Sequence, residues 1–247
     1  GQATAGLFQI EATDSTAVAS ITRNADGVQG PVLVLGKSRG TSNGSNTVVQ
    51  SGDNLGLIYF AGADGTDSQT VAGRIQCQVD GTPGSNDMPG RLIFSTTADG
   101  AASPTERLRI TAGGGFHFTN GELIERANVT AGKLSDNTNI DLENGMVHLF
   151  TTTETTTCTP NIRINSSTSL NSVMAVGETI SVTLITTAAA GGYSAQLTID
   201  GGAVNENWTG GSPPNDGGSS GVDIYAYTIV KTADATFTVV ATQTKTS

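Results

Sequence analysis

The first half of the chain alternates short apolar runs with polar turns, a pattern that predicts short β-strands. Residues 92–94 and 108–110 are β-prone runs bounded by glycine and proline, which favour turns. Residues 32–35 read Val-Leu-Val-Leu and are apolar on both faces, so we expect a strand that is buried on both sides. Further short strands are expected at residues 7–10, 17–22, 48–49 and 55–60.

Asp-Gly pairs divide this half at regular intervals. They occupy residues 64–65, 80–81 and 99–100 and lie 16 and 19 residues apart. Both residue types tolerate the left-handed backbone of tight hairpin turns. The spacing leaves room for strands of about five or six residues. We therefore predict that residues 1–127 form a hairpin-rich, elongated, shaft-like segment.

The pattern changes in the second half, where longer strands are expected. Residues 179–184, Thr-Ile-Ser-Val-Thr-Leu, give the clearest alternation. Six or seven strands within about 100 residues predict an antiparallel β-sandwich or jelly-roll-like module at residues 145–247. The polar residues 128–144 are expected to be a linker, and residues 121–129 hint at a helical turn. The expected strands are residues 146–150, 162–165, 179–185, 195–200, 222–230 and 236–242.

The composition indicates a chain with little material for a core of its own. Leu, Ile, Val and Phe together make up about 22% of the 247 residues, close to the roughly 20% below which chains tend to be disordered. Threonine and glycine are abundant, as expected for half-buried strands joined by tight turns. The fold class predicted is therefore all-β, and association between chains is the usual way to complete such a core.

The net charge of −10 and the scattered basic residues argue against nucleic-acid binding, which needs clustered Lys and Arg. No apolar run reaches the ~18 residues of a membrane span, and the first residues show no basic-then-apolar signal peptide. We expect neither nucleic acid nor membrane insertion. Ile75, Cys77 and Val79 alternate on one face, so Cys77 is expected to be a small core residue.

Enzyme signatures are missing from the sequence. There is no Walker loop and no Gly-x-Ser-x-Gly elbow. The aspartates at 26, 64, 80 and 99 are explained by their turns, so no carboxylate pair for glycoside hydrolysis can be singled out. His117 and His148 have no identifiable nucleophile for a triad. We expect a protein that is not an enzyme and needs no cofactor.

Two stretches could hold a metal ion, although each has a simpler explanation. His117 lies between Phe116 and Phe118. In a three-chain assembly it would supply three imidazoles, or it faces solvent while the two phenylalanines pack inward. A second, oxygen-rich stretch could ligate Ca²⁺, but it matches no EF-hand loop, and a solvated linker is favoured. Its residues are Asp136, Asn139, Asp141 and Glu143.

Trp208 is the only tryptophan and precedes the glycine-rich loop 210–221. A rigid aromatic beside a polar loop can stack on a sugar while neighbouring amides and carboxylates bind its hydroxyls. The alternative is that Trp208 fills one end of the sandwich. Tyr225 and Tyr227 share one strand face and are expected in a core or a subunit interface. The candidate receptor-binding residues are Trp208, Asn205, Asn207, Asn215 and Asp216.

Residues 90–110, GRLIFSTTADGAASPTERLRI, resemble a segment that recurs in tail-fibre and other virion structural proteins of tailed bacteriophages, especially marine ones. The run from Asn144 to residue 243, which includes LENGMVHLF, INSSTSLNSVMAVGETISVTL, NWTGGSPP and DIYAYTIVKTADATFTVVATQ, resembles a C-terminal module seen with it.

The resemblance implies a non-enzymatic virion structural protein that assembles as an intertwined homotrimer. It implies a place in the virion tail fibre, outside the cell, with other virion or tail proteins as partners. Its work would be host attachment through a surface glycan or an outer-membrane receptor. Two other functions stay open: a virion decoration or connector protein without receptor binding, and a cellular adhesin or filament subunit.

Overall fold

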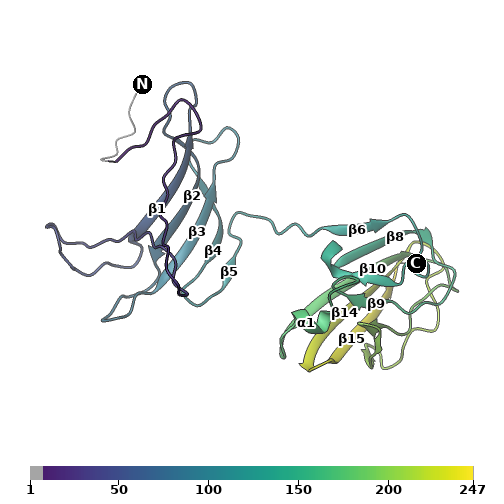
Figure 1. Ribbon diagram of the computed structural model, residues 1–247. Helices are drawn as coiled ribbons and strands as arrows, with labels where there is room; N and C mark the ends of the chain where they lie inside the picture. The colour runs from purple at the N-terminus through teal and green to yellow at the C-terminus, as the bar shows by residue number, and fades with distance from the viewer. Residues whose placement is uncertain (1–7, 247) are drawn as a thin grey trace. The chain divides into compact units, whose positions relative to one another are not determined.

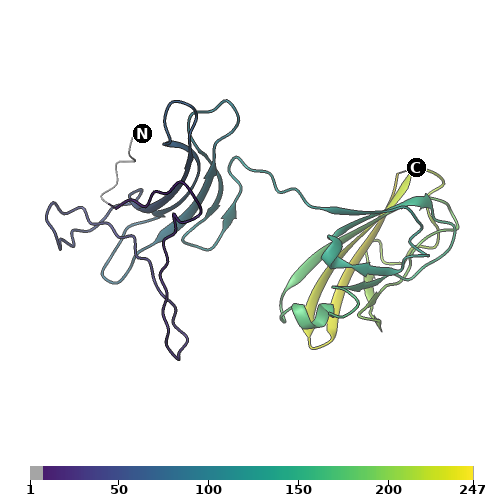
Figure 2. The ribbon, with the colours of Figure 1, turned by 45° about the horizontal axis from the view of Figure 1, so that its top comes forward.

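The computed structural model describes residues 8–246 and is nearly all β, with 40% strand and 3% helix. The chain forms two compact units, Gly1–Leu123 and Ile124–Ser247. We refer to them as the N-terminal and the C-terminal unit (Figures 1 and 2). Each unit has sheets of its own, so the all-β prediction holds for both.

The first part of the N-terminal unit differs from the prediction. Residues 8–53 contain no strand or helix, so the strands expected at residues 17–22, 32–35 and 48–49 are absent. The one expected at residues 7–10 is irregular where described, and Leu7 lies outside the described residues. Strands require hydrogen-bonded neighbours, and no described segment pairs with these residues in a sheet.

Five strands form one antiparallel sheet in the order β1-β2-β3-β4-β5 (Figure 1). The three Asp-Gly pairs lie in the connections between consecutive strands from β1 to β4. Gly65 and Gly100 there have φ of 94° and 74°, which glycine tolerates without steric cost. The strands are β1 (Asn54–Gly62), β2 (Thr70–Val79), β3 (Gly90–Thr96), β4 (Thr105–Ile110) and β5 (Phe116–His117).

The C-terminal unit contains two sheets. The larger has the order β13-β15-β14-β10-β8-β6 and the smaller the order β12-β11-β9-β7. The larger sheet comprises β6 (Ala127–Thr130), β8 (Val147–Thr153), β10 (Thr179–Thr187), β13 (Glu206–Trp208), β14 (Val222–Ala233) and β15 (Thr236–Lys245). The smaller comprises β7 (Asn139–Asp141), β9 (Asn161–Arg163), β11 (Thr198–Ile199) and β12 (Gly202–Ala203), and a short helix α1 (Leu170–Val173) follows β9.

Both sheets contribute to one hydrophobic core, which gives the unit a sandwich-like character. Ile140 and Ile162 of the smaller sheet belong to the same buried cluster as Val182, Leu184 and Tyr225 of the larger one. Burial of these side chains is the main favourable contribution to folding of the unit.

The strand pairing is mixed, which corrects the purely antiparallel sandwich that the pattern predicted. β10 pairs antiparallel with β14 but parallel with β8, and β7 and β9 also run parallel. Parallel neighbours need a long crossover, and the segment between β8 and β10 provides one because it leaves the larger sheet to form β9 and α1.

Residues 128–144 are not a linker. They contain most of β6, then β7 and the short helix η1 (Leu142–Asn144), and their Leu134, Ile140 and Leu142 are buried in the core. The compact units divide instead between Leu123 and Ile124. The helical turn expected at residues 121–129 is also absent, since these residues are irregular up to β6. The polar composition suggested a linker because many side chains of this stretch point outward and are polar, although those between them are buried.

Candidate functional site

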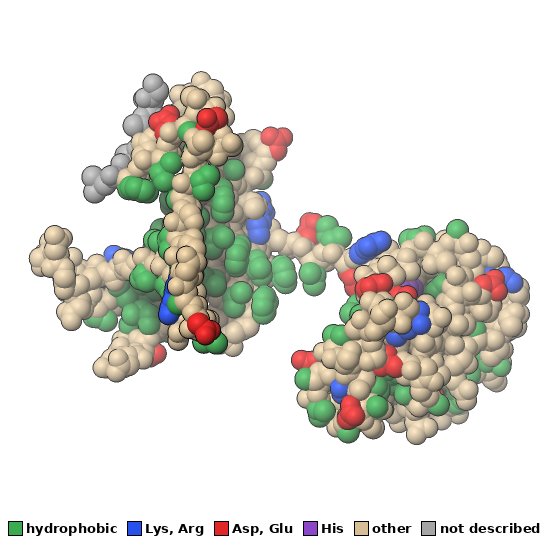
Figure 3. All heavy atoms as spheres, viewed as in Figure 1, with side chains coloured by type: hydrophobic (Ala, Val, Ile, Leu, Met, Phe, Trp, Pro, Cys, Tyr) green, Lys and Arg blue, Asp and Glu red, His purple; other side chains and the backbone are tan. Residues whose placement is uncertain are grey.

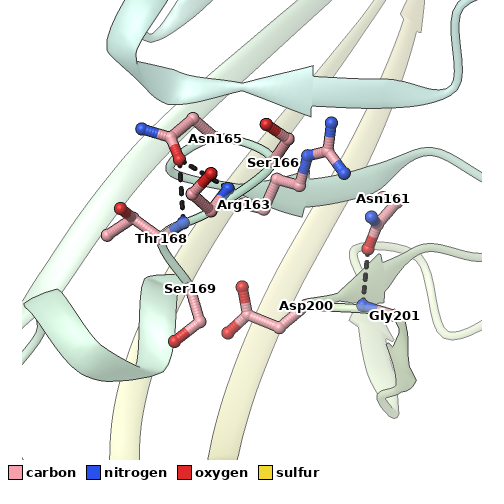
Figure 4. Close-up of a pocket in the computed structure, with 9 residues that line it drawn as sticks. Asn161, Arg163, Asn165, Ser166, Thr168, Ser169, Asp200 and Gly201 are labelled. Carbon is pink, nitrogen blue, oxygen red and sulfur yellow. Dashed lines mark hydrogen bonds between the residues drawn. The ribbon is translucent and has the colours of Figure 1, made fainter.

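A polar cleft of about 420 Å³ lies in the C-terminal unit beside β9 (Figure 4). It is built on the parallel pair β7 and β9, whose registers set Asn139 opposite Asn161 and Asp141 opposite Arg163. The intervening Ile140 and Ile162 are in the core, and alternation along a strand turns the polar residues the other way. The lining residues are Asn161, Arg163, Asn165, Ser166, Ser167, Thr168, Ser169, Asp200 and Gly201.

Three side-chain hydrogen bonds join the β7 and β9 segments beside the cleft. The amide of Asn161 donates to Oδ1 of Asn139 at 2.9 Å, and Nε of Arg163 donates to Oδ1 of Asp141 at 2.6 Å. The amide of Asn165 donates to Oε2 of Glu143 at 2.9 Å. The bond to Asp141 raises the pKa of the Arg163 guanidinium, which therefore stays protonated.

These bonds change the interpretation of the oxygen-rich stretch considered for Ca²⁺. The side-chain oxygens of Asn139, Asp141 and Glu143 each accept a hydrogen bond from the β9 segment, and Asp136 is exposed. A calcium site would need six to eight oxygens converging on one point. Within residues 8–246, no group of three or more His, Cys, Asp or Glu side chains is placed to hold a metal ion.

The opposite wall of the cleft is held by Asp200. Its carboxylate accepts hydrogen bonds from the backbone N–H groups of Leu170 and Asn171, at 2.7 and 2.9 Å, at the start of α1. Asp200 adopts φ of +53°, which is uncommon for a residue other than glycine. The side chain of Asn161 reaches this wall, where its Oδ1 accepts from the N–H of Gly201 at 2.7 Å (Figure 4).

The loop between β9 and α1 is fixed in the same way. Oδ1 of Asn165 accepts the backbone N–H groups of Ser167 and Thr168, both at 2.8 Å (Figure 4). Oγ of Ser169 accepts the N–H of Ser172 at 3.1 Å and so caps α1. Hydroxyl groups therefore line a cleft whose backbone is held by side-chain hydrogen bonds.

The lining of the cleft is made of polar groups that can form hydrogen bonds. Three nearby carboxylates are engaged in hydrogen bonds, Asp141 with Arg163, Glu143 with Asn165 and Asp200 with the α1 backbone. The two terminal nitrogens of Arg163 make no hydrogen bond to any residue in the described range. Together with the serine and threonine hydroxyls, they can bind a polar, hydroxyl-rich ligand.

Trp208 lies in the core, as the second of the two alternatives predicted. Only 9% of its area is exposed, and it stands on β13, which pairs with β15 at one edge of the larger sheet. Within residues 8–246, its indole Nε1 is buried without a hydrogen-bond partner. Little of the ring is therefore available for a sugar to stack on.

Of the other four candidate residues, only Asn207 lines the same groove as Trp208. Asn207 lines a groove of about 260 Å³ with Trp208, but its amide donates to the carbonyl oxygen of Val239 at 3.0 Å. Asn205 and Asn215 are exposed and do not line this groove. Asp216 forms an ion pair with Lys245. The structure therefore does not bring all five predicted receptor-binding residues into one groove.

The remaining candidate side chains divide between core and surface. Tyr225 and Tyr227 are fully buried in the core, and burial raises the pKa of Tyr225 to about 12. His117 and the flanking Phe116 and Phe118 are exposed, so within one chain the phenylalanines do not pack inward as expected. Cys77 is half-buried on the same face of β2 as Ile75.

The cleft residues were not singled out from the sequence, although a signal for them exists. Residues 139–143 read Asn-Ile-Asp-Leu-Glu and residues 161–165 read Asn-Ile-Arg-Ile-Asn. The shared alternation predicts two strands with matching polar faces, and the Asp and Arg at the same position suggest that the strands pair. Asp200 carries no comparable signal, since a tight turn alone explains an Asp-Gly-Gly sequence.

No protein-family model matches the chain, and no characterised protein matches it significantly. No helix within residues 8–246 is long and apolar enough to cross a membrane. A functional assignment therefore depends on the site and on the resemblance described above.

Proposed function

We propose that the protein is a non-enzymatic bacteriophage tail-fibre protein that attaches the virion to the host surface as a homotrimer. The sequence resemblance supports the family, and its first segment falls on β3 and β4. The proposed location is the tail fibre of the virion, outside the cell, with other virion proteins as further partners.

The observation that carries the attachment function is the polar cleft beside β9. Its lining is dominated by hydroxyl, amide and guanidinium groups, which are the groups that bind the hydroxyls of a glycan. The cleft is held by its own hydrogen bonds, so little conformational entropy is lost when a ligand binds. Several such sites in one fibre add avidity to a weak single contact.

Binding of the whole chain to an array of bacterial surface polysaccharides and lipopolysaccharides tests this function. Arg163→Ala is expected to weaken binding about tenfold or more if Arg163 is a main contact. Arg126→Ala is the matched control, because Arg126 is an exposed arginine of the same unit outside the cleft.

The possible outcomes separate the candidate functions. Binding that both variants retain would exclude the cleft as the receptor site. An assembled chain that binds no polysaccharide, no lipopolysaccharide and no bacterial cell would contradict attachment and favour a decoration or connector protein.

A further inference from the structure

The two faces of the N-terminal sheet differ in chemistry. The strand registers place Ile58 opposite Ile75, Cys77 opposite Leu92, and Leu92 opposite Ile110. The same alternation assigns further apolar residues to this side, which we call the apolar face. Its large side chains are Ile58, Phe60, Ile75, Cys77, Leu92, Phe94, Leu108, Ile110 and Phe116.

The opposite face is closed by its own polar side chains. Arg91 forms an ion pair with Asp80 at 2.8 Å, and Arg109 forms one with Glu106 at 2.9 Å. Beneath these charged groups Ile93 is buried. These charged groups are paired within the face, whereas Oε1 of the buried Gln76 has no hydrogen-bond partner within residues 8–246.

Within the described residues, no second sheet or helix of this unit packs on the apolar face, and Leu35 of the irregular segment contacts only part of it. The five strands are the only sheet of the N-terminal unit within the described residues, and a sheet normally buries its apolar side against another layer. Ile58 is 44% exposed and Phe116 is 65% exposed. Figure 3 shows hydrophobic side chains gathered at the surface of this unit.

The face also contains a groove that accepts an aliphatic side chain. Its volume is about 260 Å³, and Ile58, Ile75 and Leu92 form part of its wall. Leu35 enters it from the preceding segment so closely that a Cβ on Gly56 would lie 2.6 Å from the Leu35 Cβ. The shape and chemistry of the groove therefore suit a further apolar side chain.

Charge favours a second copy of this chain as the occupant of the face. The regularly alternating strand positions on this face carry no charged residue. Arg107, at the irregularity in β4, donates hydrogen bonds to the hydroxyl of Thr96 and to the carbonyl oxygen of Asn120. The same uncharged face of another copy can pack on it without burying an unpaired charge. A strongly charged partner would lose the hydration of its charges and find no opposite charge on this face.

The area of the face is sufficient for a small specific interface. Strands about 4.8 Å apart and about six residues long make a five-stranded face of roughly 24 Å by 20 Å, or about 480 Å². Three such faces turned toward one another bury about 1,400 Å² in total, above the ~1,000 Å² expected of a specific interface.

We infer that the apolar face is the self-association surface of the chain, on which the same faces of the neighbouring copies pack. This inference rests on the proposed homotrimer, in which the apolar faces of all three copies turn toward a common axis. In this arrangement, neighbouring copies supply the second layer that covers the apolar face of the N-terminal sheet.

Ile58 and Tyr59 provide a matched test, because they are adjacent on β1, point to opposite faces and are 44% and 56% exposed. Light scattering of the full 25.1 kDa chain at micromolar concentration is expected to give a trimer. We expect Ile58→Lys to reduce the mass to that of a monomer and Tyr59→Lys to leave it unchanged.

Cys77 supplies an independent measurement from within the face, while Cys158 is buried in the C-terminal unit and serves as reference. Alkylation of Cys77 is expected to be at least about tenfold faster in Ile58→Lys than in the assembled native chain, because opening the interface exposes the thiol. An equal rate in both proteins would contradict the inference.

Several results would overturn the proposal. These are a monomeric native chain with a reactive Cys77, an Ile58→Lys variant that still assembles, or equal loss of assembly in both lysine variants. If Ile58→Lys fails to fold by circular dichroism, Phe116→Lys repeats the test at the other edge, with His117→Lys as its control on the opposite face. A monomer that binds host polysaccharide would refute this interface but leave the proposed attachment function standing. A trimer that binds no polysaccharide, lipopolysaccharide or bacterial cell would refute attachment but leave the interface standing.

Discussion

The indole of Trp208 packs edge-on against the ring of Tyr227, with ring centroids 6.2 Å apart and planes at 74°. This arrangement is the favoured geometry for aromatic pairs. It joins the short edge strand β13 to β14 in the interior of the larger sheet. The only tryptophan of the chain is therefore a core residue and a fluorescent reporter on the C-terminal unit.

Trp208→Ala is expected to destabilise the C-terminal unit by about 3–5 kcal/mol, because truncation leaves a cavity beside Tyr227. Urea unfolding followed by circular dichroism measures the loss. Trp208→Phe keeps most of the packing and should cost less. A variant of native stability that loses only glycan binding would instead make Trp208 a ligand contact.

His148 is expected to make stability depend on pH. Its Nε2–H donates to the carbonyl oxygen of Gly145 at 3.0 Å, and Nδ1 accepts from the amide of Asn128 at 3.2 Å. Burial lowers the pKa of His148 below its usual value of 6.5. The unfolded chain therefore binds a proton more readily than the folded chain.

The free energy of unfolding should accordingly fall as the pH decreases from about 7 to about 5. At higher pH, His148 is neutral in both states and should not make stability depend on pH. Thermal unfolding followed by Trp208 fluorescence across this range measures the change. His148→Gln should flatten the profile. A profile that is equally steep in this variant would assign the dependence to another group.

Gly192 is expected to tolerate no side chain. A Cβ there would lie 2.2 Å from the carbonyl oxygen of Glu154, whose buried carboxylate accepts hydrogen bonds from Ser135 and from the N–H of Thr155. Gly192→Ala should therefore cost about 3 kcal/mol of unfolding free energy. Gly191→Ala is the control, since its Cβ would meet its nearest neighbour at 3.5 Å. Equal stability of the two variants would contradict the prediction.

In the segment between the two units, limited trypsin digestion is expected to cut at Arg126, which is exposed and lies in the irregular residues between β5 and β6. Cleavage there leaves all strands of the C-terminal unit intact, so residues 127–247 should persist as a folded fragment. Mass spectrometry identifies the fragment. Early cleavage at Arg163 or Lys231 would show that this unit does not fold separately.

The sequence predicted several elements of the C-terminal unit well. Alternation at residues 179–185 corresponds to β10 (Thr179–Thr187), and the runs at 222–230 and 236–242 correspond to β14 and β15. These strands have one buried and one less buried side, so a period of two is visible in sequence. Tyr225 and Tyr227 were expected to be buried for the same reason, and they are.

The linker prediction failed for residues 128–144 because the average composition of this stretch does not distinguish its buried positions from its exposed ones. Asn139 and Asp141 face outward while Ile140 between them is fully buried. The cleft could not be located either, since it needs β9, α1 and Asp200 to meet after a separation of about 30 residues. Sequence patterns show local periodicity but do not show which distant segments come into contact.

The sequence by itself determined the all-β class, the Asp-Gly turns and the scarcity of large aliphatic side chains. Tertiary structure alone decided that β8 and β10 run parallel and that Trp208 is buried against Tyr227. It also decided that, within the described residues, no second sheet or helix of its unit packs on the face that contains Ile58. The physical reason is that local patterning fixes which side of a strand is apolar, whereas long-range packing decides whether anything covers that side.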